Sequence, residues 1–146
     1  MKRLACAMVM LAGVTLAHAA PQSASRTADM RDAVDRITNA AENSDYHLVK
    51  VQAIDTALVK RGYEDPGVRI LFLGKASAME QAEKDYPPLL SMLPIKLVLV
   101  VRGTQIVVIS DDLDAWKEMF PEPAAHRLIE MWRQDIEQML KDFAAR

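Results

Sequence analysis

Cysteine, glycine and aromatic residues are all scarce in this sequence. Among 146 residues there are one cysteine, Cys6, five glycines and 5% aromatic residues. A single cysteine excludes a disulfide within the chain, and no glycine-rich loop is present that could hold a nucleotide phosphate. Basic residues are not in excess either, because 18 Lys and Arg stand against 20 Asp and Glu, for a net charge of −2. A nucleic-acid-binding surface is therefore not expected.

What is present is the composition of one folded domain. Hydrophobic residues make up 51% and charged residues 26% of the chain, which is typical of globular proteins. The length is that of a single domain, at about 150 residues per domain. A chain of this size can bury about two thirds of its unfolded surface, which is enough for a stable core without disulfides.

The first residues have the three parts of a secretory signal. Lys2 and Arg3 form a positive start, residues 4–17 are an uncharged apolar run, and small residues stand at alternate positions in Ala17-His18-Ala19. The apolar run is shorter than the about 20 residues that a membrane-spanning helix needs. We therefore expect a periplasmic or secreted protein, with the signal removed and no stable membrane insertion afterwards.

Cleavage is expected after Ala19, which makes residues 1–19 the signal peptide. Cleavage after Ala20 is the alternative, but Pro21 would then directly follow the cut bond. Cys6 leaves with the signal, so the mature chain has no thiol and no cysteine nucleophile. The mature chain also keeps 16 basic against 20 acidic residues, for a net charge of −4.

The mature chain alternates strand and helix patterns. Residues 20–27 are small and polar and are interpreted as a flexible lead-in to one domain, residues 28–146. Apolar alternation and β-branched runs predict four strands, over residues 46–54, 68–73, 95–102 and 105–109. Helical spacing of apolar residues predicts helices over residues 28–43, 55–61, 77–86, 110–120 and 123–144. The predicted fold class is α+β, a mostly antiparallel four-stranded sheet with helices packed on one face.

Two of these elements are marked most strongly. Gly103-Thr104 separates the last two strands and suits a two-residue hairpin turn with glycine first. The last helix carries a long apolar stripe, made of Leu128, Ile129, Trp132, Ile136, Met139, Leu140 and Phe143. A stripe of this width is typical of core, although it could also line an apolar ligand groove or a partner surface.

Residues that could carry chemistry are few. His47 and His126 are the only histidines of the mature chain, so a three-histidine zinc site is impossible, and we expect neither a metal nor a cofactor. His47 lies on the apolar face of its predicted strand and is favoured as a hydrogen-bonded core residue over a catalytic base. Asp111, Asp112 and Asp114 fall in the first turn of a predicted helix, where the helix dipole favours acids.

The segment after the second predicted strand is the best candidate for a binding site. Gly74-Lys75-Ala76-Ser77 follows a strand and precedes a helix, so its backbone N–H groups could receive an anion. Lys96 starts a strand next to a proline turn, where a cation can meet an anionic substrate, and its simpler alternative is a solvated lysine. The candidate binding residues are His47, Arg69, Gly74, Lys75 and Lys96.

Short motifs in this region resemble the family named domain of unknown function 302. They are Leu71-Phe72-Leu73-Gly74, Pro87 and Leu93-Pro94-Ile95-Lys96, with Ile54-Asp55 and Gly62-Tyr63 upstream and Ser110-Asp111-Asp112-Leu113 downstream. The resemblance covers about residues 30–142. Many relatives have Asn-Pro after the glycine and some carry cysteines near these motifs, whereas this chain has Lys75 and Ala76 and no cysteine there.

The resemblance implies a compact α+β fold, similar to the TATA-box-binding-protein-like class in its layout of sheet and helices. It also implies that the chain is often paired as a homodimer, and it implies no established activity. A likeness at the level of the fold says nothing about DNA binding, and the acidic charge argues against it.

Two functions of different classes follow. The favoured one is a non-catalytic periplasmic domain that binds a small ligand or a protein partner as a homodimer. It rests on the predicted export, the apolar stripe and the missing set of catalytic residues. The alternative is a small periplasmic enzyme that acts on an anionic substrate near the Gly74 loop, with His47 or a carboxylate together with Lys96 and Arg69.

Overall fold

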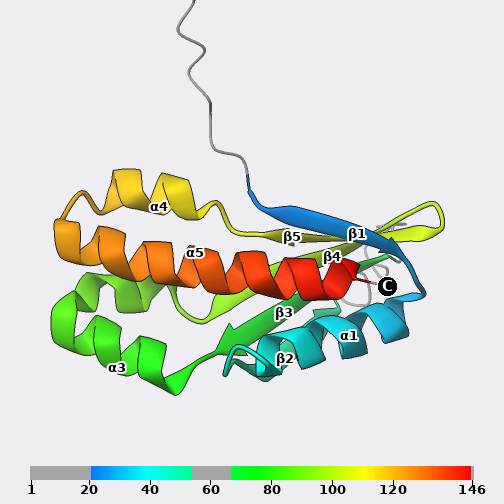
Figure 1. The fold of residues 1–146 in the computed structure, drawn as a ribbon, viewed down its shortest axis with the longest axis horizontal. Helices are drawn as coiled ribbons and strands as arrows, with labels where there is room; N and C mark the ends of the chain where they lie inside the picture. Colours follow the sequence, from blue (N-terminus) through cyan, green and yellow to red (C-terminus); the bar gives the residue numbers. More distant parts are fainter. Residues whose placement is uncertain (1–20, 54–66, 146) are drawn as a thin grey trace, which may run out of the picture.

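A computed structural model describes residues 21–53 and 67–145 (Figure 1). Five antiparallel strands form one sheet in this part of the chain, in the order β1-β5-β4-β3-β2. They are β1 (Ser23–Thr27), β2 (His47–Ala53), β3 (Val68–Gly74), β4 (Ile95–Arg102) and β5 (Gln105–Ser110). The α+β class and the antiparallel sheet are confirmed.

The sheet has five strands where the sequence predicts four, because part of the predicted lead-in, residues 20–27, forms β1. This strand pairs with β5 in unbroken register, from Ser23 opposite Ile109 to Thr27 opposite Gln105. The prediction of a flexible segment is wrong for these residues. Strand formation depends strongly on the partner strand, and here the apolar β5 gives a small, polar sequence a strand to pair with.

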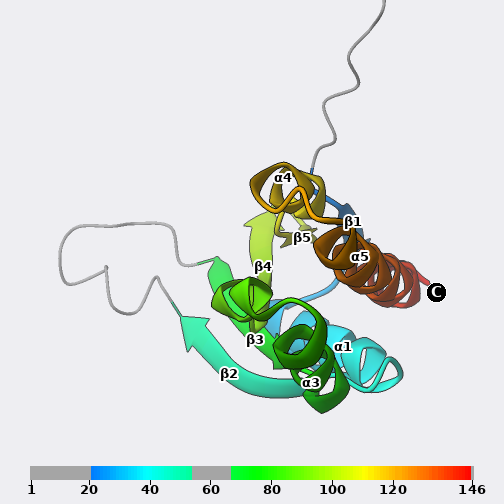
Figure 2. The same cartoon turned by 90° about the vertical axis from the view of Figure 1, so that its left-hand side faces the viewer.

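The helices in residues 21–53 and 67–145 lie on one side of the curved sheet (Figure 2). They are α1 (Met30–Glu42), α3 (Ala76–Asp85), the 3-10 helix η2 (Pro87–Met92), α4 (Leu113–Met119) and α5 (Pro123–Ala144). None of the described helices is long and apolar enough to cross a membrane. The predicted signal peptide, residues 1–19, and the predicted helix over residues 55–61 lie outside the described residues.

Helix α4 begins later than predicted. Ser110 is the last residue of β5, and Asp112 caps the helix by accepting hydrogen bonds from the backbone N–H groups of Asp114 and Ala115, both at 3.1 Å. An aspartate satisfies these otherwise open donors as well as a serine does.

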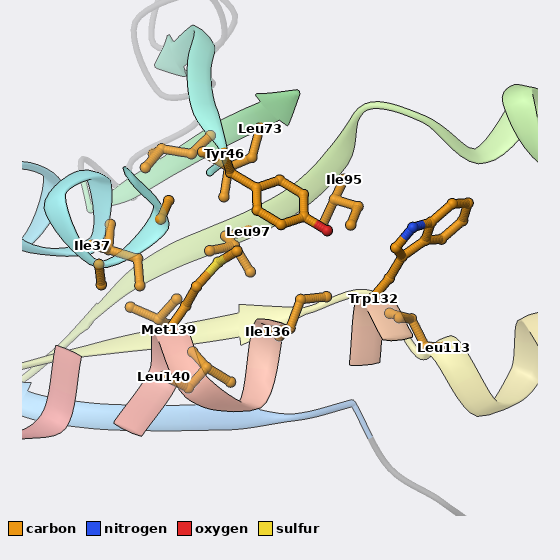
Figure 3. Close-up of a cluster of buried hydrophobic side chains, with 14 of the residues drawn as sticks. Ile37, Tyr46, Leu73, Ile95, Leu97, Leu113, Trp132, Ile136, Met139 and Leu140 are labelled. Carbon is orange, nitrogen blue, oxygen red and sulfur yellow. The ribbon is translucent and has the colours of Figure 1, made fainter. Parts of the chain in front are cut away.

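The core lies between the sheet and the helices (Figure 3). All seven residues of the predicted stripe on α5 are buried, none more than 5% exposed, so its interpretation as core is confirmed. Opposite them, the sheet contributes Leu71, Leu73, Leu97 and Leu99, each at most 1% exposed. The predicted hairpin is also confirmed, with Arg102 opposite Gln105 and Gly103 at a φ of 59°, a left-handed conformation that favours glycine.

Two arginines hold the end of α5. Arg26 of β1 donates from Nη1 to the carbonyl oxygens of Phe143 and Ala145, at 2.8 and 2.7 Å. Arg36 of α1 donates from Nε to the Phe143 carbonyl at 2.9 Å, and from Nη2 to those of Asp142, at 3.4 Å, and Ala145. The last carbonyls of a helix have no partner inside the helix, so these contacts join the first strand and first helix to the last turn of α5.

Candidate functional site

The turn between β3 and α3 places Lys75 against α5. Gly74 ends β3, and Lys75 immediately precedes the first turn of α3. The Lys75 ammonium donates to Oδ2 of Asp135 on α5, at 3.1 Å, and lies 4.9 Å from the centre of the Tyr46 ring. Its side chain keeps 19% exposure. The positive charge of Lys75 is therefore already balanced by a carboxylate.

Tyr46 shares this carboxylate. Its phenolic hydroxyl donates to the same Oδ2 of Asp135, also at 3.1 Å. Burial raises the pKa of Tyr46 far above its usual value, and the negative charge of Asp135 and the hydrogen bond raise it further. Tyr46 stays protonated at physiological pH, so it acts as a hydrogen-bond donor and not as a base.

A small cavity adjoins this group. Its volume is about 10 Å³, and it is lined by Tyr46, Leu73, Gly74, Lys75, Ala78, Met79, Leu93 and Pro94. A cavity of that volume has room for about one water molecule. The cavity is too small for an organic substrate. Tyr46 and Lys75 line it, and their hydrogen bonds to Asp135 join the start of β2 and the β3–α3 turn to α5.

His47 is exposed, so the prediction of a core histidine is wrong. Residue Tyr46 before it is 1% exposed, and Leu48 after it packs against the core. A bulge between Leu48 and Lys50 then shifts the register of β2. Because a bulge interrupts the alternation of side chains, the pattern read from the sequence assigns the wrong face to His47, whereas Val51 beyond the bulge lies opposite the buried Leu71.

The strand register brings three of the candidate residues together. His47 lies directly opposite Gly74, and Lys75 is the next residue after Gly74. Val49 lies over the glycine, since a Cβ atom on Gly74 would come 3.0 Å from Val49 Cγ2. These candidates share one end of the β2–β3 pair.

Arg69 and Lys96 lie elsewhere. Arg69 is five residues before Gly74 on β3, about 17 Å away along the strand, and its Nη1 donates to the Val68 carbonyl at 2.8 Å. Lys96 pairs with Phe72 on the side of the sheet away from the helices, and its ammonium lies 3.4 Å from Oδ1 of Asp111. Lys75 faces α5 and Lys96 faces the opposite side, so the five candidates do not form one site.

The acidic residues near α4 have structural partners. Asp111 pairs with Lys96 at 3.4 Å, Asp112 caps the helix, and Asp114 lies 3.2 Å from Lys117. In residues 21–53 and 67–145, no three His, Cys, Asp or Glu side chains are arranged to hold a metal ion.

An extended apolar surface lies on the face of the sheet opposite the described helices. Directly opposed residues of an antiparallel pair share a face, and the registers join seven apolar residues on this one: Val68, Ile70, Phe72, Val98, Val100, Val107 and Ile109. None of them belongs to the core cluster or packs against it. Six are half-buried and Val100 is 9% exposed. We call these seven residues the open face.

Polar residues border the open face on both sides. Ser23, Ser25 and Thr27 of β1 are exposed next to β5. Lys50 lies opposite Phe72 at the β2 side, and Gln52 lies opposite Ile70. The border is therefore uncharged along β1 and basic along β2, and Lys96 and Arg102 lie on the same face at the two ends of β4.

Sequence reasoning missed both Asp135 and the open face. Tyr46 and Asp135 are 89 residues apart, so no local pattern connects them. The open face does have a signal: residues 70–73, 97–101 and 106–109 are apolar at consecutive positions. Such runs are typical of strands whose two faces are both covered. Helices on one face of the sheet can cover only that face.

Comparisons with known proteins place this fold in a family. The family described as "Domain of unknown function DUF302" matches residues 22–143. Among curated proteins no match is found. Among solved structures, the uncharacterised conserved protein DUF302 from Bacillus stearothermophilus is similar with a TM-score of 0.77 and 13% identity, over 84% of this chain and 96% of that chain. This likeness shows a shared fold.

Proposed function

The chain belongs to the DUF302 family, whose description gives no activity, and we propose that it is a non-catalytic binding domain that acts after export as a homodimer. The partner is a second copy of the chain, and the contact is the open face. The observation that carries the proposal is the set of seven apolar side chains on a sheet whose described helices lie on the other side.

The size of the whole sheet face, the open face with its polar border on β1 and β2, fits a modest dimer contact. Its five strands, spaced about 4.8 Å apart and with about six residues each at 3.3 Å, cover roughly 500 Å². Two such faces bury on the order of 1,000 Å², which is the lower limit for a specific interface. Apolar patches of several hundred Å² on a single chain often mark a binding surface.

The polar border favours a twofold arrangement. β4 is the middle strand of the five, so a twofold axis parallel to the strands near β4 would place β3 of one copy over β5 of the other. β2 would then lie over β1 of the partner. Lys50 would face serine and threonine side chains and not another lysine. Lys96 on the central β4 would lie near Lys96 of the other copy, with each charge paired with its own Asp111 at 3.4 Å. The apolar residues would meet each other about 10 Å apart, as in packed sheets.

The polar clusters support a role without catalysis. Lys75 and Lys96 are each paired with a carboxylate, at 3.1 and 3.4 Å, and lie on opposite sides of the sheet. Tyr46 is held protonated by burial and by Asp135. A general base needs a pKa near the working pH and access to a substrate, and Tyr46 has neither.

Analytical ultracentrifugation of the mature chain tests the dimer. We expect a dimer for the wild type and a monomer for Phe72→Lys, because the lysine would be buried unpaired in the contact. The matched control is Met119→Lys on α4, where the methionine is 61% exposed, and it should remain a dimer. A monomeric wild type, or a folded Phe72→Lys dimer, would contradict the proposal.

Cell fractionation tests export. We expect the protein in the periplasm or the medium, with Ala20 as its first residue. Edman sequencing or intact-mass measurement of the purified protein identifies that residue. A cytosolic protein that keeps residues 1–19 would show that the export part of the proposal is wrong.

A further inference from the structure

β1 is a sheet edge without the usual protection. Both β1 and β2 are outer strands, each with one edge that pairs with no other described strand. Proteins guard such edges with bulges and charged residues, especially lysine. β2 has a bulge and Lys50. β1 has an unbroken register, and its one charged residue, Arg26, is turned to the end of α5.

The outer backbone groups of β1 can be assigned. The Ser110 N–H donates to the Gln22 carbonyl at 2.9 Å, so Gln22 directs its backbone toward β5. Residues of an antiparallel strand alternate in this respect, so Ala24 and Arg26 also face β5. Ser23, Ser25 and Thr27 therefore direct their N–H and C=O groups away from the sheet.

A groove runs between this edge and α5. Its volume is about 340 Å³, and it is lined by Gln22, Ser23, Ala24, Glu137, Leu140, Lys141 and Ala144. Each of these residues lies on α5, on β1 or next to β1, and none lies on β5. The groove therefore opens at the edge of the sheet. Oε1 of Gln22 is buried and has no hydrogen-bond partner. The wall of the groove thus contains a hydrogen-bond acceptor, the Gln22 side-chain oxygen, to which no described group donates.

We propose that β1 accepts an extended peptide segment of another protein as a sixth strand. The outward N–H and C=O groups of Ser23, Ser25 and Thr27 would pair with the peptide backbone, as in strand addition to a sheet edge. Every second peptide side chain would enter the groove. Leu140, Ala24 and Ala144 contribute apolar surface there, so these side chains are apolar and of small to medium size.

The charges at the groove favour a neutral segment. Glu137 and Lys141 form an ion pair at 2.8 Å across one turn of α5. Neither charge is left to select a partner of opposite sign. Specificity then comes from alternate apolar side chains and from a donor that can reach Oε1 of Gln22.

A second copy of β1 does not meet these requirements. The inward side chains of β1 are those of Ala24 and Arg26. Ala24 packs against its own core, and Arg26 is bound to the carbonyls of Phe143 and Ala145 at 2.8 and 2.7 Å. Neither is available to fill the groove of a neighbour. The proposed site is thus separate from the dimer contact on the open face.

Selection from a phage-displayed library of random nine-residue peptides on the mature wild-type protein tests the proposal. We expect enriched peptides with apolar residues at alternate positions. NMR spectra of the protein with such a peptide should show the largest amide shifts at Ser23, Ser25 and Thr27. If no peptides are enriched, or if the amide shifts lie on another element, the proposal is wrong.

Two variants and one control separate edge pairing from other modes of binding. Ser25→Pro removes an outward N–H and keeps the hydrogen bonds to β5, a position where edge strands tolerate proline. Ala144→Leu fills the groove from α5 without changing β1. Each should weaken binding of a selected peptide about tenfold, whereas Ser25→Ala keeps the N–H and should bind like the wild type.

Calorimetric titration measures these affinities, and circular dichroism checks that each variant is folded. Unchanged affinity in folded Ser25→Pro and Ala144→Leu would overturn the proposal. Ultracentrifugation of the same samples should give the wild-type mass, so a failure of peptide binding is distinguished from a failure of the dimer.

Discussion

Arg26 and Arg36 donate to the same backbone oxygen, the carbonyl of Phe143, at 2.8 and 2.9 Å. One arginine comes from the first strand and the other from the first helix, 117 and 107 residues away from Phe143. The carbonyls at the end of a helix carry partial negative charge. The two guanidinium groups give these carbonyl oxygens hydrogen-bond donors, and their positive charge stabilises the partial negative charge at the end of α5.

Arg36→Ala should lower the free energy of unfolding by about 1–2 kcal/mol, because hydrogen bonds to a charged donor and a favourable dipole interaction are lost. Urea unfolding followed by circular dichroism measures the change. Arg31→Ala is the matched control, since Arg31 is exposed on the same helix. It should change stability by less than about 0.5 kcal/mol, and equal losses in both variants would contradict the role of Arg36.

Glu130 should make stability depend on pH in acid. Arg133 and Lys117 each donate to its carboxylate at 2.7 Å, and the hydrogen bond from Arg133, followed by that from Lys117, lowers the pKa of Glu130 from 4.5 to about 2. The lowered pKa adds stability above about pH 4.5, and that stability is lost as the pH falls toward 2. Because the Glu130 side chain is about one third exposed, solvent weakens these ion pairs, and we expect them to contribute about 1 kcal/mol to the free energy of unfolding.

The variant Glu130→Gln should therefore be less stable than the wild type at neutral pH and equally stable near pH 2. Urea unfolding at a series of pH values measures the difference. Glu118, an exposed glutamate on α4, provides the control, and Glu118→Gln should leave stability nearly unchanged. A difference between wild type and Glu130→Gln that does not shrink in acid would refute the assignment.

The two glycines at turns should respond differently to alanine. Gly103 has a φ of 59°, so Gly103→Ala should cost about 1 kcal/mol through backbone strain. At Gly74 the new methyl group would meet only the Val49 side chain at 3.0 Å, and Val49 is 65% exposed and can turn away. Gly74→Ala should cost less than Gly103→Ala, as thermal unfolding can show, and the reverse order would indicate that glycine is required at the β3–α3 turn.

The enzyme alternative can be tested at His47 and Lys96. Acting together, they would need to meet at one substrate, but His47 is exposed at the start of β2 and Lys96 is engaged with Asp111 at 3.4 Å. The double alanine variant should keep the dimer mass and reverse any phenotype that deletion of the gene causes, as fully as the wild type does. Failure to do so, with the variant folded and present at normal level, would favour the enzyme.

The sequence predicts best where the chain itself ends an element. Pro123 begins the last helix and Gly103 turns the hairpin, and both elements agree with the prediction to within a residue. It fails where the cause is distant. β1 has no apolar alternation of its own and depends on β5, about 80 residues later, and the bulge in β2 reverses the face assigned to His47. Export and the TATA-box-binding-protein-like layout stay predictions.

The candidate site was predicted only in part, for the same reason. Gly74 and Lys75 lie at the turn that the sequence indicates, but the carboxylate that neutralises Lys75 comes from a helix 60 residues away. The sequence groups Arg69 and Lys96 with them as cations near the Gly74 loop, Lys96 because it starts a strand beside a proline turn. Distance along β3 and the alternation of faces separate them, and both depend on a register that a single sequence does not contain.

The short first strand also determines where the chain can be shortened. Starting the protein at residue 28 would remove β1 and with it Arg26. β5 would become the outer strand, and its run Ile106–Ile109 would present unpaired backbone groups between apolar side chains. Exposed edges of this kind promote aggregation, so a trimmed protein should precipitate where the chain from Ala20 stays in solution.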